Sequence, residues 1–277
     1  MRLRDYLERL GITPPLGGGA AAIGRLHLAH REAFLFENLS IQTGGRISLA
    51  LADLERKFLD DGRGGYCFEH NVLFAAALGD LGFNPITLLA RVRRGPPERW
   101  ARTHMVLRVS IDGESWLADV GFGGLGLLEP MPLRDGAVST QGGLTYTLRR
   151  DEYVWVLSMR DATSSAMDLY EFADDPQTPG DVEVANHFTS THRDSVFRHT
   201  LTIQRTRRDE RTMLRNRTLT RYREGRMAEE SIERGRLHDL ARDAFGVDLP
   251  SGPFVFEAAA PASDPRLKPT TAPASLI

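Results

Sequence analysis

The chain has 277 residues, of which 41% are hydrophobic and 26% charged, the composition of an ordinary globular protein. Its 35 basic and 37 acidic residues leave a net charge of −2, so the charge gives no reason to expect nucleic acid or an anionic membrane as a partner. The single cysteine excludes an internal disulfide and a cysteine-based zinc site, and no metal site is predicted. The charged first residues lack the apolar core of a signal peptide, so we expect a cytoplasmic protein.

The first third of the chain has the periodicity of helices. Apolar residues within 3–10 recur three and four positions apart, as on one face of a helix, and 20–34 and 51–58 have similar patterns. Residues 67–81 are rich in Ala, Leu and Phe, and Gly82 suits the end of such a helix. We therefore predict four helices in this region.

Beyond Asn84-Pro85 the pattern changes to short β-branched and aromatic runs, separated by turn residues such as Asp112-Gly113. The strands predicted in this way are 86–93, 104–111, 114–120, 144–150, 153–159, 199–205 and 217–222. A last helix is predicted over 234–245, ended by Gly246, and the Ala/Pro-rich tail 258–277 is expected to lack regular structure. Helices followed by an antiparallel sheet or barrel do not form the alternating βαβ pattern of nucleotide-binding folds.

Cys67 stands where a glycine-containing loop, Arg63-Gly64-Gly65-Tyr66, meets the first turn of a predicted helix. A lone cysteine is more often a small buried apolar residue than a nucleophile. At a helix start, however, unpaired backbone N–H groups and the helix dipole favour negative charge. We therefore expect a lowered thiol pKa, and Cys67 is the candidate nucleophile.

His104 and Asp119 are the candidate partners of this thiol, because a nucleophilic thiol needs a proton acceptor and that acceptor needs an orienting group. If Asp112-Gly113 is a two-residue turn, the register of the hairpin places Asp119 opposite Val106. His104 and Asp119 then point to the same face as diagonal neighbours. A loop of odd length would place them on opposite faces.

The remaining histidines are weaker candidates. His70 follows Cys67 by three residues on the same predicted helix, so it is a minor rival to His104 as the partner of the thiol. Among the others, His27 and His30 lie on a helical segment, and His187 and His192 in an expected polar loop.

A second glycine-rich feature, Asp119-Val120-Gly121-Phe122-Gly123-Gly124, follows the hairpin. Glycine allows close approach of the backbone and unusual dihedral angles. The segment is either an ordinary turn or a loop that lets a long acyl carrier lie across the thiolate. It lacks the strand-to-helix context of a phosphate-binding loop.

Four stretches resemble, in the same order, the arylamine N-acetyltransferases: Phe36-Glu37-Asn38-Leu39, Arg63-Gly64-Gly65-Tyr66-Cys67-Phe68-Glu69, Thr103-His104-Met105 and Asp119-Val120-Gly121-Phe122-Gly123. A later stretch with Asn186, Ser190-Thr191-His192 and Phe197 is also similar, and the resemblance covers roughly residues 3–250. Two positions depart from the family pattern. Leu35 stands where proline is usual, and His70 where leucine or glutamine is common.

The resemblance implies an α+β multi-domain fold, with a helical bundle over 1–84, an antiparallel β-barrel over 85–185 and an α/β lid over 186–277. It implies a core similar to that of cysteine proteases, in which Cys67 is the nucleophile, His104 its proton partner and Asp119 the group that holds the imidazole. Acetyl-CoA would be a co-substrate rather than a tightly bound cofactor. A small aromatic amine or hydrazine would then take the acetyl group from Cys67 in a ping-pong cycle.

The resemblance also implies which residues contact the substrates. The apolar acceptor pocket would be formed by Phe36, Phe68, Val92, Phe122 and Phe197. The pantetheine arm of CoA would lie near Thr103, Gly123 and Gly124. Glu37 and Arg63 resemble an ion pair beneath the cysteine loop, which we interpret as structural. The residues that contact the CoA phosphates and the oligomeric state stay open, a homo-oligomer included.

Two other enzyme classes fit the same three catalytic residues. A hydrolase of the cysteine-protease or transglutaminase type would release acyl groups to water or take them from glutamine. An amide synthase would use the same fold to close a polyketide chain released from a carrier protein. The Gly-Phe-Gly loop and the Phe-Glu-Asn-Leu stretch favour the acetyltransferase over the hydrolase. A non-enzymatic binding module is disfavoured by the three residues together.

Overall fold

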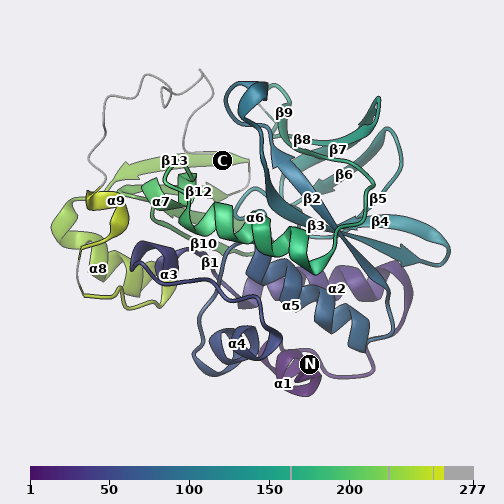
Figure 1. Ribbon diagram of the computed structural model, residues 1–277, viewed down its shortest axis with the longest axis horizontal. Coiled ribbons are helices and arrows are strands. Elements are labelled where there is room, and N and C mark those ends of the chain that lie inside the picture. The colour runs from purple at the N-terminus through teal and green to yellow at the C-terminus, as the bar shows by residue number, and fades with distance from the viewer. Residues whose placement is uncertain (163, 224, 252, 259–277) are drawn as a thin grey trace.

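The computed structural model describes residues 1–258 apart from 163, 224 and 252, and shows a helical region below two antiparallel sheets (Figure 1). The helices of the first region are α1 (Leu3–Arg9), α2 (Gly19–Ala33), α3 (Leu39–Gln42), α4 (Leu51–Glu55, continued by a π-helical turn over Arg56–Asp60) and α5 (Cys67–Asp80). All four predicted helices are confirmed, and the short α3 is an addition to them. No helix in the described part of the chain is long and apolar enough to cross a membrane.

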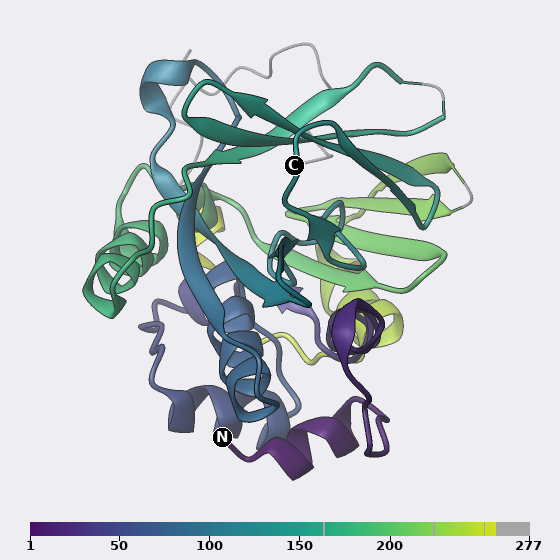
Figure 2. The ribbon, with the colours of Figure 1, turned by 90° about the vertical axis from the view of Figure 1, so that its right-hand side faces the viewer.

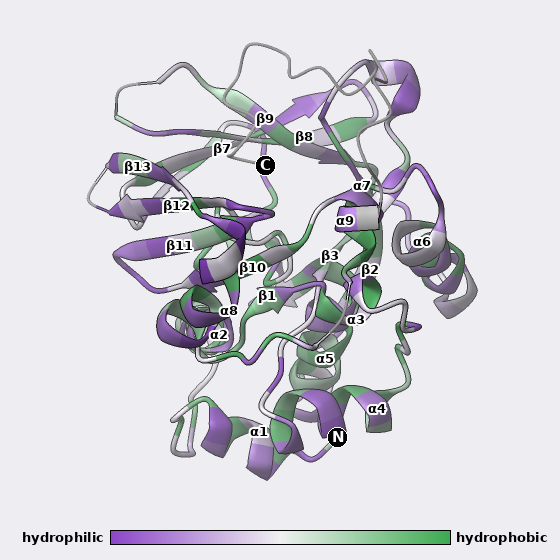
Figure 3. Cartoon of the chain, turned by 90° about the vertical axis from the view of Figure 1, so that its left-hand side faces the viewer, coloured by the Kyte–Doolittle hydropathy of each residue, from purple (hydrophilic) through white to green (hydrophobic). Residues whose placement is uncertain are grey.

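Helix α5 is the central element of the helical region, and its surface is largely hydrophobic (Figure 3). Its side chains Phe68, Leu73 and Phe74 are fully buried and pack with α1 and α2 in one core. Fully burying side chains of this size contributes about 1.5–3 kcal/mol each. At the start of α5 the Glu69 carboxylate accepts the N–H of Tyr66 at 3.1 Å, which satisfies a backbone donor that the helix leaves free.

The larger sheet has the strand order β5-β4-β3-β2-β9-β8-β7-β6 and is antiparallel throughout. Its strands are β2 (Pro85–Val92), β3 (Arg102–Ile111), β4 (Glu114–Ala118), β5 (Met131–Pro132), β6 (Ala137–Gln141), β7 (Leu144–Asp151), β8 (Val154–Arg160) and β9 (Met167–Phe172), with a 3₁₀ turn at Pro97–Arg99. Because the outermost strands β5 and β6 contact each other, the sheet curls into a nearly closed barrel. The predicted barrel is confirmed, although β5, β6 and β9 were not predicted.

The β3–β4 hairpin has the register that a two-residue Asp112-Gly113 turn requires. Ile111 pairs with Glu114, and Leu107 pairs with Ala118. Both turn residues have positive φ, 51° at Asp112 and 82° at Gly113, as a tight hairpin turn demands. The predicted register is therefore confirmed, and with it the common face of His104 and Asp119.

The smaller sheet joins distant parts of the sequence in the order β1-β10-β11-β12-β13. Its strands are β1 (Phe36–Glu37), β10 (Thr202–Thr206), β11 (Glu210–Arg215), β12 (Thr218–Arg223) and β13 (Arg226–Ser231), and β13 is exposed at its edge. Because β1 comes from the helical region and pairs with β10, the first and last thirds of the chain are tied together. Figure 2 shows this sheet beside the barrel and above α2.

The C-terminal helices are α6 (Pro179–Thr191), α7 (Val196–His199), α8 (Leu237–Leu240, with turns over Arg234–Arg236 and Ala241–Phe245) and α9 (Val255–Ala258). The late helix is confirmed, and Gly246 ends it with a φ of 68°. The expectation of a polar loop around His187 is wrong, because Thr178 and Asp181 form a capping box that starts α6. The predicted boundary at 185/186 falls within α6, and the division into domains stays a prediction. Most of the predicted loose tail, 259–277, lies outside the described residues.

Candidate active site

Cys67 is the first residue of α5 and is only 3% exposed. The loop before it is held against β1, because Glu37 donates its N–H to the carbonyl of Gly65 at 2.7 Å and Gly65 donates its own to Leu35 at 3.2 Å. A Cβ atom on Gly64 would lie 1.8 Å from the Leu35 carbonyl oxygen, so glycine alone permits this approach. The two glycines therefore set the position of the cysteine.

A group of buried charges lies beneath the cysteine loop. The predicted ion pair is present: Arg63 Nη2 lies 2.8 Å from Oε1 of Glu37. Lys57 Nζ lies 2.6 Å from Oε1 of Glu69 and 3.9 Å from Oε1 of Glu37. Both carboxylates are almost fully buried, and each has a cation beside it, as buried charges require.

His104 of β3 and Asp119, which directly follows β4, meet in the interior. His104 Nε2 lies 2.8 Å from Oδ2 of Asp119, and both residues are at most 2% exposed. The other carboxylate oxygen accepts hydrogen bonds from Asn71 Nδ2 at 3.1 Å and from the N–H of Gly121 at 2.9 Å. Burial acts to raise the pKa of Asp119, but the charge of His104 and these hydrogen bonds outweigh it and lower the pKa to about 2. Asp119 is therefore ionised and faces the imidazole.

The thiol lies beside the strand that carries this histidine. Cys67 Sγ lies 3.7 Å from the carbonyl oxygen of Thr103, the residue directly before His104. Nε2 of the imidazole is hydrogen-bonded to Asp119, so Nδ1 is the ring nitrogen available to a thiol. The site thus contains a thiol, an imidazole and an ionised carboxylate, all shielded from water.

The thiol pKa differs from the prediction. Burial raises the pKa of Cys67, and the Asp119 carboxylate adds to this effect. The backbone N–H groups of Phe68 and of Cys67 itself act in the opposite direction, as the helix start predicts, but they do not outweigh burial. The prediction that the helix start lowers the thiol pKa is therefore wrong. A thiolate at this place needs a cationic partner.

The rival histidine, His70, has both ring nitrogens engaged elsewhere. Its Nε2 lies 3.0 Å from the Leu35 carbonyl, its Nδ1 lies 2.8 Å from Nε2 of His30, and His30 Nδ1 lies 2.7 Å from the Tyr6 hydroxyl. A carbonyl only accepts, so His70 Nε2 donates, His30 Nε2 donates to His70, and Tyr6 donates to His30. The chain of bonds is complete with both rings neutral, which leaves no nitrogen of His70 for Cys67.

Three of the aromatic residues predicted for the acceptor pocket gather around Tyr66. The ring centroids of Phe36 and Phe197 are 6.2 Å apart. Tyr66 contacts Phe197 at 5.3 Å and Phe68 at 5.5 Å, although Phe68 itself is fully buried in the core. The structure therefore brings these side chains together across α5, α7 and β1.

The other two predicted pocket residues lie near the imidazole. Phe122 contacts the ring of His104 at 5.2 Å and that of Tyr170 at 5.1 Å. Val92 is the strand partner of Tyr170. Tyr170, which the sequence analysis missed, also contacts His104 at 5.1 Å, so it joins Val92 and Phe122 to the site.

The residues predicted to lie near pantetheine fall in two places. The carbonyl of Thr103 faces the thiol. Gly124 packs on the smaller sheet, where its N–H donates to Oε1 of Gln204, and a Cβ atom on it would lie 2.3 Å from Sδ of Met213. Gly123 has a φ of 86°, a conformation that favours glycine. Contact of these residues with a carrier stays a prediction.

Comparison with known proteins identifies the family. A sequence model of the N-acetyltransferase family matches residues 21–253. The arylamine N-acetyltransferase / N-hydroxyarylamine O-acetyltransferase of Salmonella typhimurium is 36% identical over 251 residues, or 89% of each chain. The chain belongs to the arylamine N-acetyltransferase family. It is accordingly an acyltransferase, and the resemblance stated from its motifs is confirmed.

Solved structures agree with this assignment and with the α+β fold. An arylamine N-acetyltransferase from Salmonella typhimurium matches with a TM-score of 0.82 at 34% identity, over 93% of this chain and 96% of that one. The Mycobacterium marinum enzyme in complex with CoA matches with a TM-score of 0.83 at 32% identity, over 88% and 92%. A more distant relative is proansamycin X synthase of Amycolatopsis mediterranei, 27% identical over 179 residues, 63% of this chain and 68% of that protein.

Asn71 is a site residue of this acetyltransferase that the sequence analysis missed. Its Nδ2 donates to Asp119 and, at 2.7 Å, to the Met105 carbonyl, and its Oδ1 accepts the N–H of Val120 at 3.2 Å. It follows Cys67 by four residues, one turn along the same face of α5, and that spacing was the available signal. Asn71 thereby links the helix of the nucleophile to the segment of the carboxylate.

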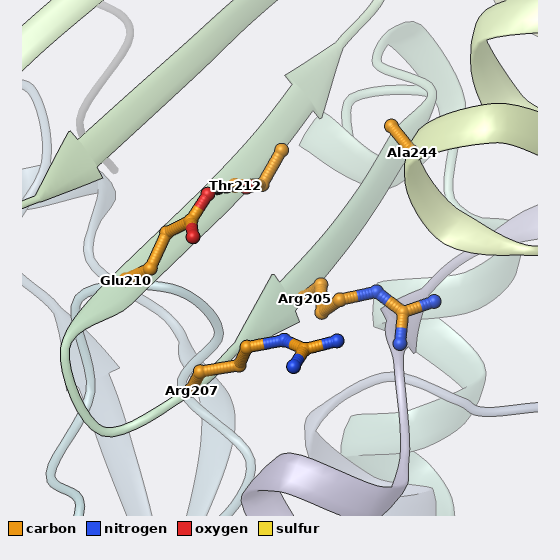
Figure 4. Close-up of a pocket in the computed structure, with 5 residues that line it drawn as sticks. All are labelled: Arg205, Arg207, Glu210, Thr212 and Ala244. Carbon is orange, nitrogen blue, oxygen red and sulfur yellow. Dashed lines mark hydrogen bonds between the residues drawn. The ribbon is translucent and has the colours of Figure 1, made fainter.

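A cavity of about 200 Å³ lies elsewhere on the acetyltransferase, and its lining residues are Arg205, Arg207, Glu210, Thr212 and Ala244. Both guanidinium groups point into the same space (Figure 4). Gln204, which holds Gly124, points to the other face of β10, because successive strand residues alternate. None of the predicted site residues lines this cavity. Among the described residues, no group of His, Cys, Asp and Glu is arranged to hold a metal ion.

Proposed function

We propose that this acyltransferase moves an acetyl group from acetyl-CoA to the nitrogen of a small aromatic amine or hydrazine, through a thioester on Cys67. The observation that carries the proposal is the buried pair of His104 and Asp119 beside the thiol. The CoA complex of the Mycobacterium marinum relative supports CoA as the carrier. The names of the relatives support an arylamine as the acceptor.

In the first half of the proposed cycle, the proton of the Cys67 thiol moves to Nδ1 of His104, and the thiolate attacks the thioester carbonyl of acetyl-CoA. The ionised Asp119 at 2.8 Å stabilises the imidazolium that forms. The bond from the carbonyl carbon to the CoA sulfur breaks, and the imidazolium returns the proton to that sulfur. The products are acetyl-Cys67 and CoA.

In the second half, the amine nitrogen attacks the acetyl carbonyl and gives a proton to His104. The bond between the carbonyl carbon and Sγ breaks, and the proton passes to the sulfur of Cys67. The aromatic side chains around Tyr66 and Tyr170 suit a flat aromatic acceptor, because rings favour contact with other rings. We assign Phe36, Phe122 and Phe197 to this role.

A second candidate is amide synthesis on a polyketide chain, and the presence of a relative named as a synthase, proansamycin X synthase, supports it. The chemistry at Cys67 would be the same, but the acyl group would be a long chain and its acceptor an amine of that chain. The Salmonella relative is more similar and matches more of the chain, 89% against 63%, so acetyl transfer ranks first.

Incubation with acetyl-CoA and no acceptor tests the proposal directly. Intact mass should show one added acetyl group, peptide mapping should place it on Cys67, and added arylamine should remove it. The Cys67→Ser variant should fold but show no adduct, because a hydroxyl is a far poorer nucleophile at neutral pH. An unchanged mass together with cleavage of peptide or ester substrates would refute the transferase. Loading from a long-chain acyl thioester alone would favour the amide synthase.

A further inference from the structure

Helix α2 lies against β10 and contacts the segment that follows the β3–β4 hairpin. One of its side chains, His27, is fully buried and bonded at both nitrogens. Nδ1 lies 2.9 Å from the Leu128 carbonyl, and the backbone N–H of Asp119 donates to Nε2 at 3.2 Å. Because a carbonyl only accepts, Nδ1 carries the proton and the ring is neutral. His27 therefore binds the peptide group of the carboxylate residue itself.

One helical turn further, Arg31 bonds to the same segment. Its guanidinium donates to the carbonyls of Val120, at 3.3 Å, and Gly123, and to Oγ1 of Thr206 at 3.2 Å. The residue is 4% exposed and, within the described residues, has no ion-pair partner. Burial lowers the pKa of Arg31 to about 10, so the group remains charged at neutral pH. The hydrogen bonds of this buried cation go to two loop carbonyls and a hydroxyl and not to a carboxylate, so they hold the Val120–Gly123 loop in place.

Because the peptide bond is planar, the contact of Arg31 with the loop also orients a hydrogen-bond donor toward the Asp119 carboxylate. The carbonyl of Val120 and the N–H of Gly121 belong to one planar trans peptide and point in opposite directions. When Arg31 holds the carbonyl, the N–H is aimed the other way, and it donates to Oδ1 of Asp119 at 2.9 Å. The peptide after Gly123 is held likewise: its carbonyl accepts from Arg31 and its N–H donates to Gln204.

We propose that His27 and Arg31 are positioning residues for the reaction, which together fix the Asp119 carboxylate and the Val120–Gly123 backbone against His104. The inference rests on the proposed function, in which Asp119 orients the imidazole. His27 holds the peptide N–H of Asp119. Arg31 holds the loop that supplies its N–H donor. Neither side chain touches the thiol.

The groups around Asp119 come from four elements: His104 from β3, Asn71 and Cys67 from α5, Tyr170 from β9, and His27 and Arg31 from α2. Loss of the Arg31 guanidinium frees the Val120 peptide to turn, so the Gly121 N–H no longer supports the ionised carboxylate. The carboxylate then accepts a proton more easily and holds the imidazolium less well. The consequence is a thiolate that forms only at higher pH.

The test is the pH dependence of Cys67 alkylation by iodoacetamide, together with kcat/KM for acetyl transfer. We expect Arg31→Met to move the acid limb of alkylation upward by about one pH unit. Its kcat/KM should fall about 10- to 100-fold, the effect of a misplaced catalytic group. Arg31→Lys, which keeps a cation, should partly restore both the wild-type alkylation profile and the wild-type kcat/KM. Arg211→Met is the matched control, because Arg211 is equally buried but donates to Gly142 and not to this segment.

A second pair of variants keeps the inference testable if Arg31→Met does not fold. His27→Gln retains an acceptor for the Asp119 N–H and should keep the alkylation profile, whereas His27→Phe should shift it. Equal profiles for His27→Phe and the wild type, or an equal shift in Arg211→Met, would overturn the inference. If Asp119→Asn transfers acetyl groups normally, the proposed function fails instead.

Discussion

Three buried neutral histidines should make the stability of this enzyme fall steeply below neutral pH. Burial lowers the pKa of His27 to about 4 and of His70 to about 3, and it lowers the pKa of His30 well below the ordinary 6.5. Between these values and 6.5 the unfolded chain binds protons that the folded chain does not. The free energy of unfolding therefore decreases as the pH falls.

The magnitude follows from the proton linkage. For one histidine with an unfolded pKa of about 6.5 that stays neutral when folded, the loss between pH 7 and pH 5 is about 2 kcal/mol. Three such residues lose about 6 kcal/mol, a large part of the typical 5–15 kcal/mol of a folded domain. All three are at most 2% exposed, so solvent does little to screen the effect.

Urea unfolding at pH 7 and pH 5 measures this loss, and the His70→Gln variant isolates one contribution. Glutamine does not titrate and keeps an amide donor for the Leu35 carbonyl, so the loss between the two pH values should shrink by about 2 kcal/mol. At pH 7 the variant should be destabilised by about 1 kcal/mol, because the bond from His30 is weakened. His187→Gln, exposed on α6, is the control and should behave as the wild type. An unchanged pH dependence in His70→Gln would refute the neutral chain of Tyr6, His30 and His70.

Three substitutions near the site have further expected outcomes. Gly64→Ala should destabilise the fold by about 3 kcal/mol or more in urea unfolding, because its Cβ would stand 1.8 Å from a backbone oxygen; wild-type stability would contradict that clash. Arg63→Met should cost about 3 kcal/mol in the same assay, since it leaves Glu37 buried with Lys57 at 3.9 Å, and a neutral effect would show that Lys57 suffices. Asn71→Ala should lower kcat/KM about 10-fold or more by freeing Asp119 and Val120, whereas a change in KM alone would point to carrier binding.

The elements that sequence reasoning found are those with a local signal. The Asp112-Gly113 turn sets the register of its hairpin within a few residues, so a two-residue turn there was enough to predict that His104 and Asp119 share a face. The two glycines before Cys67 marked a tight loop, although the carbonyl that requires Gly64 belongs to Leu35, 29 residues earlier.

The features that were missed depend on packing between segments distant in sequence. The sequence identifies His27 only as a residue on a helix, because nothing local shows that α2 lies against a segment that begins 92 residues later. The burial of Arg31 cannot be predicted from the sequence for the same reason. Strand β1 is two residues long and is formed by pairing with the distant β10, which no periodicity reveals. Burial also determines the direction in which the pKa of Cys67 is displaced, and the backbone N–H groups at the helix start are too weak to reverse it.

Under the proposed function, that last difference bears on the origin of the reactivity expected of Cys67. A helix start that lowered the thiol pKa would leave a free thiolate, whose alkylation would continue when His104 is removed. In the proposed mechanism, with burial dominant, a thiolate would exist only while the proton rests on His104, and the ionised Asp119 would favour the imidazolium. Asp119→Asn should therefore reduce alkylation at neutral pH nearly as much as His104→Gln does. Persistent alkylation in both variants would show that the start of α5, and not His104 with Asp119, activates the thiol.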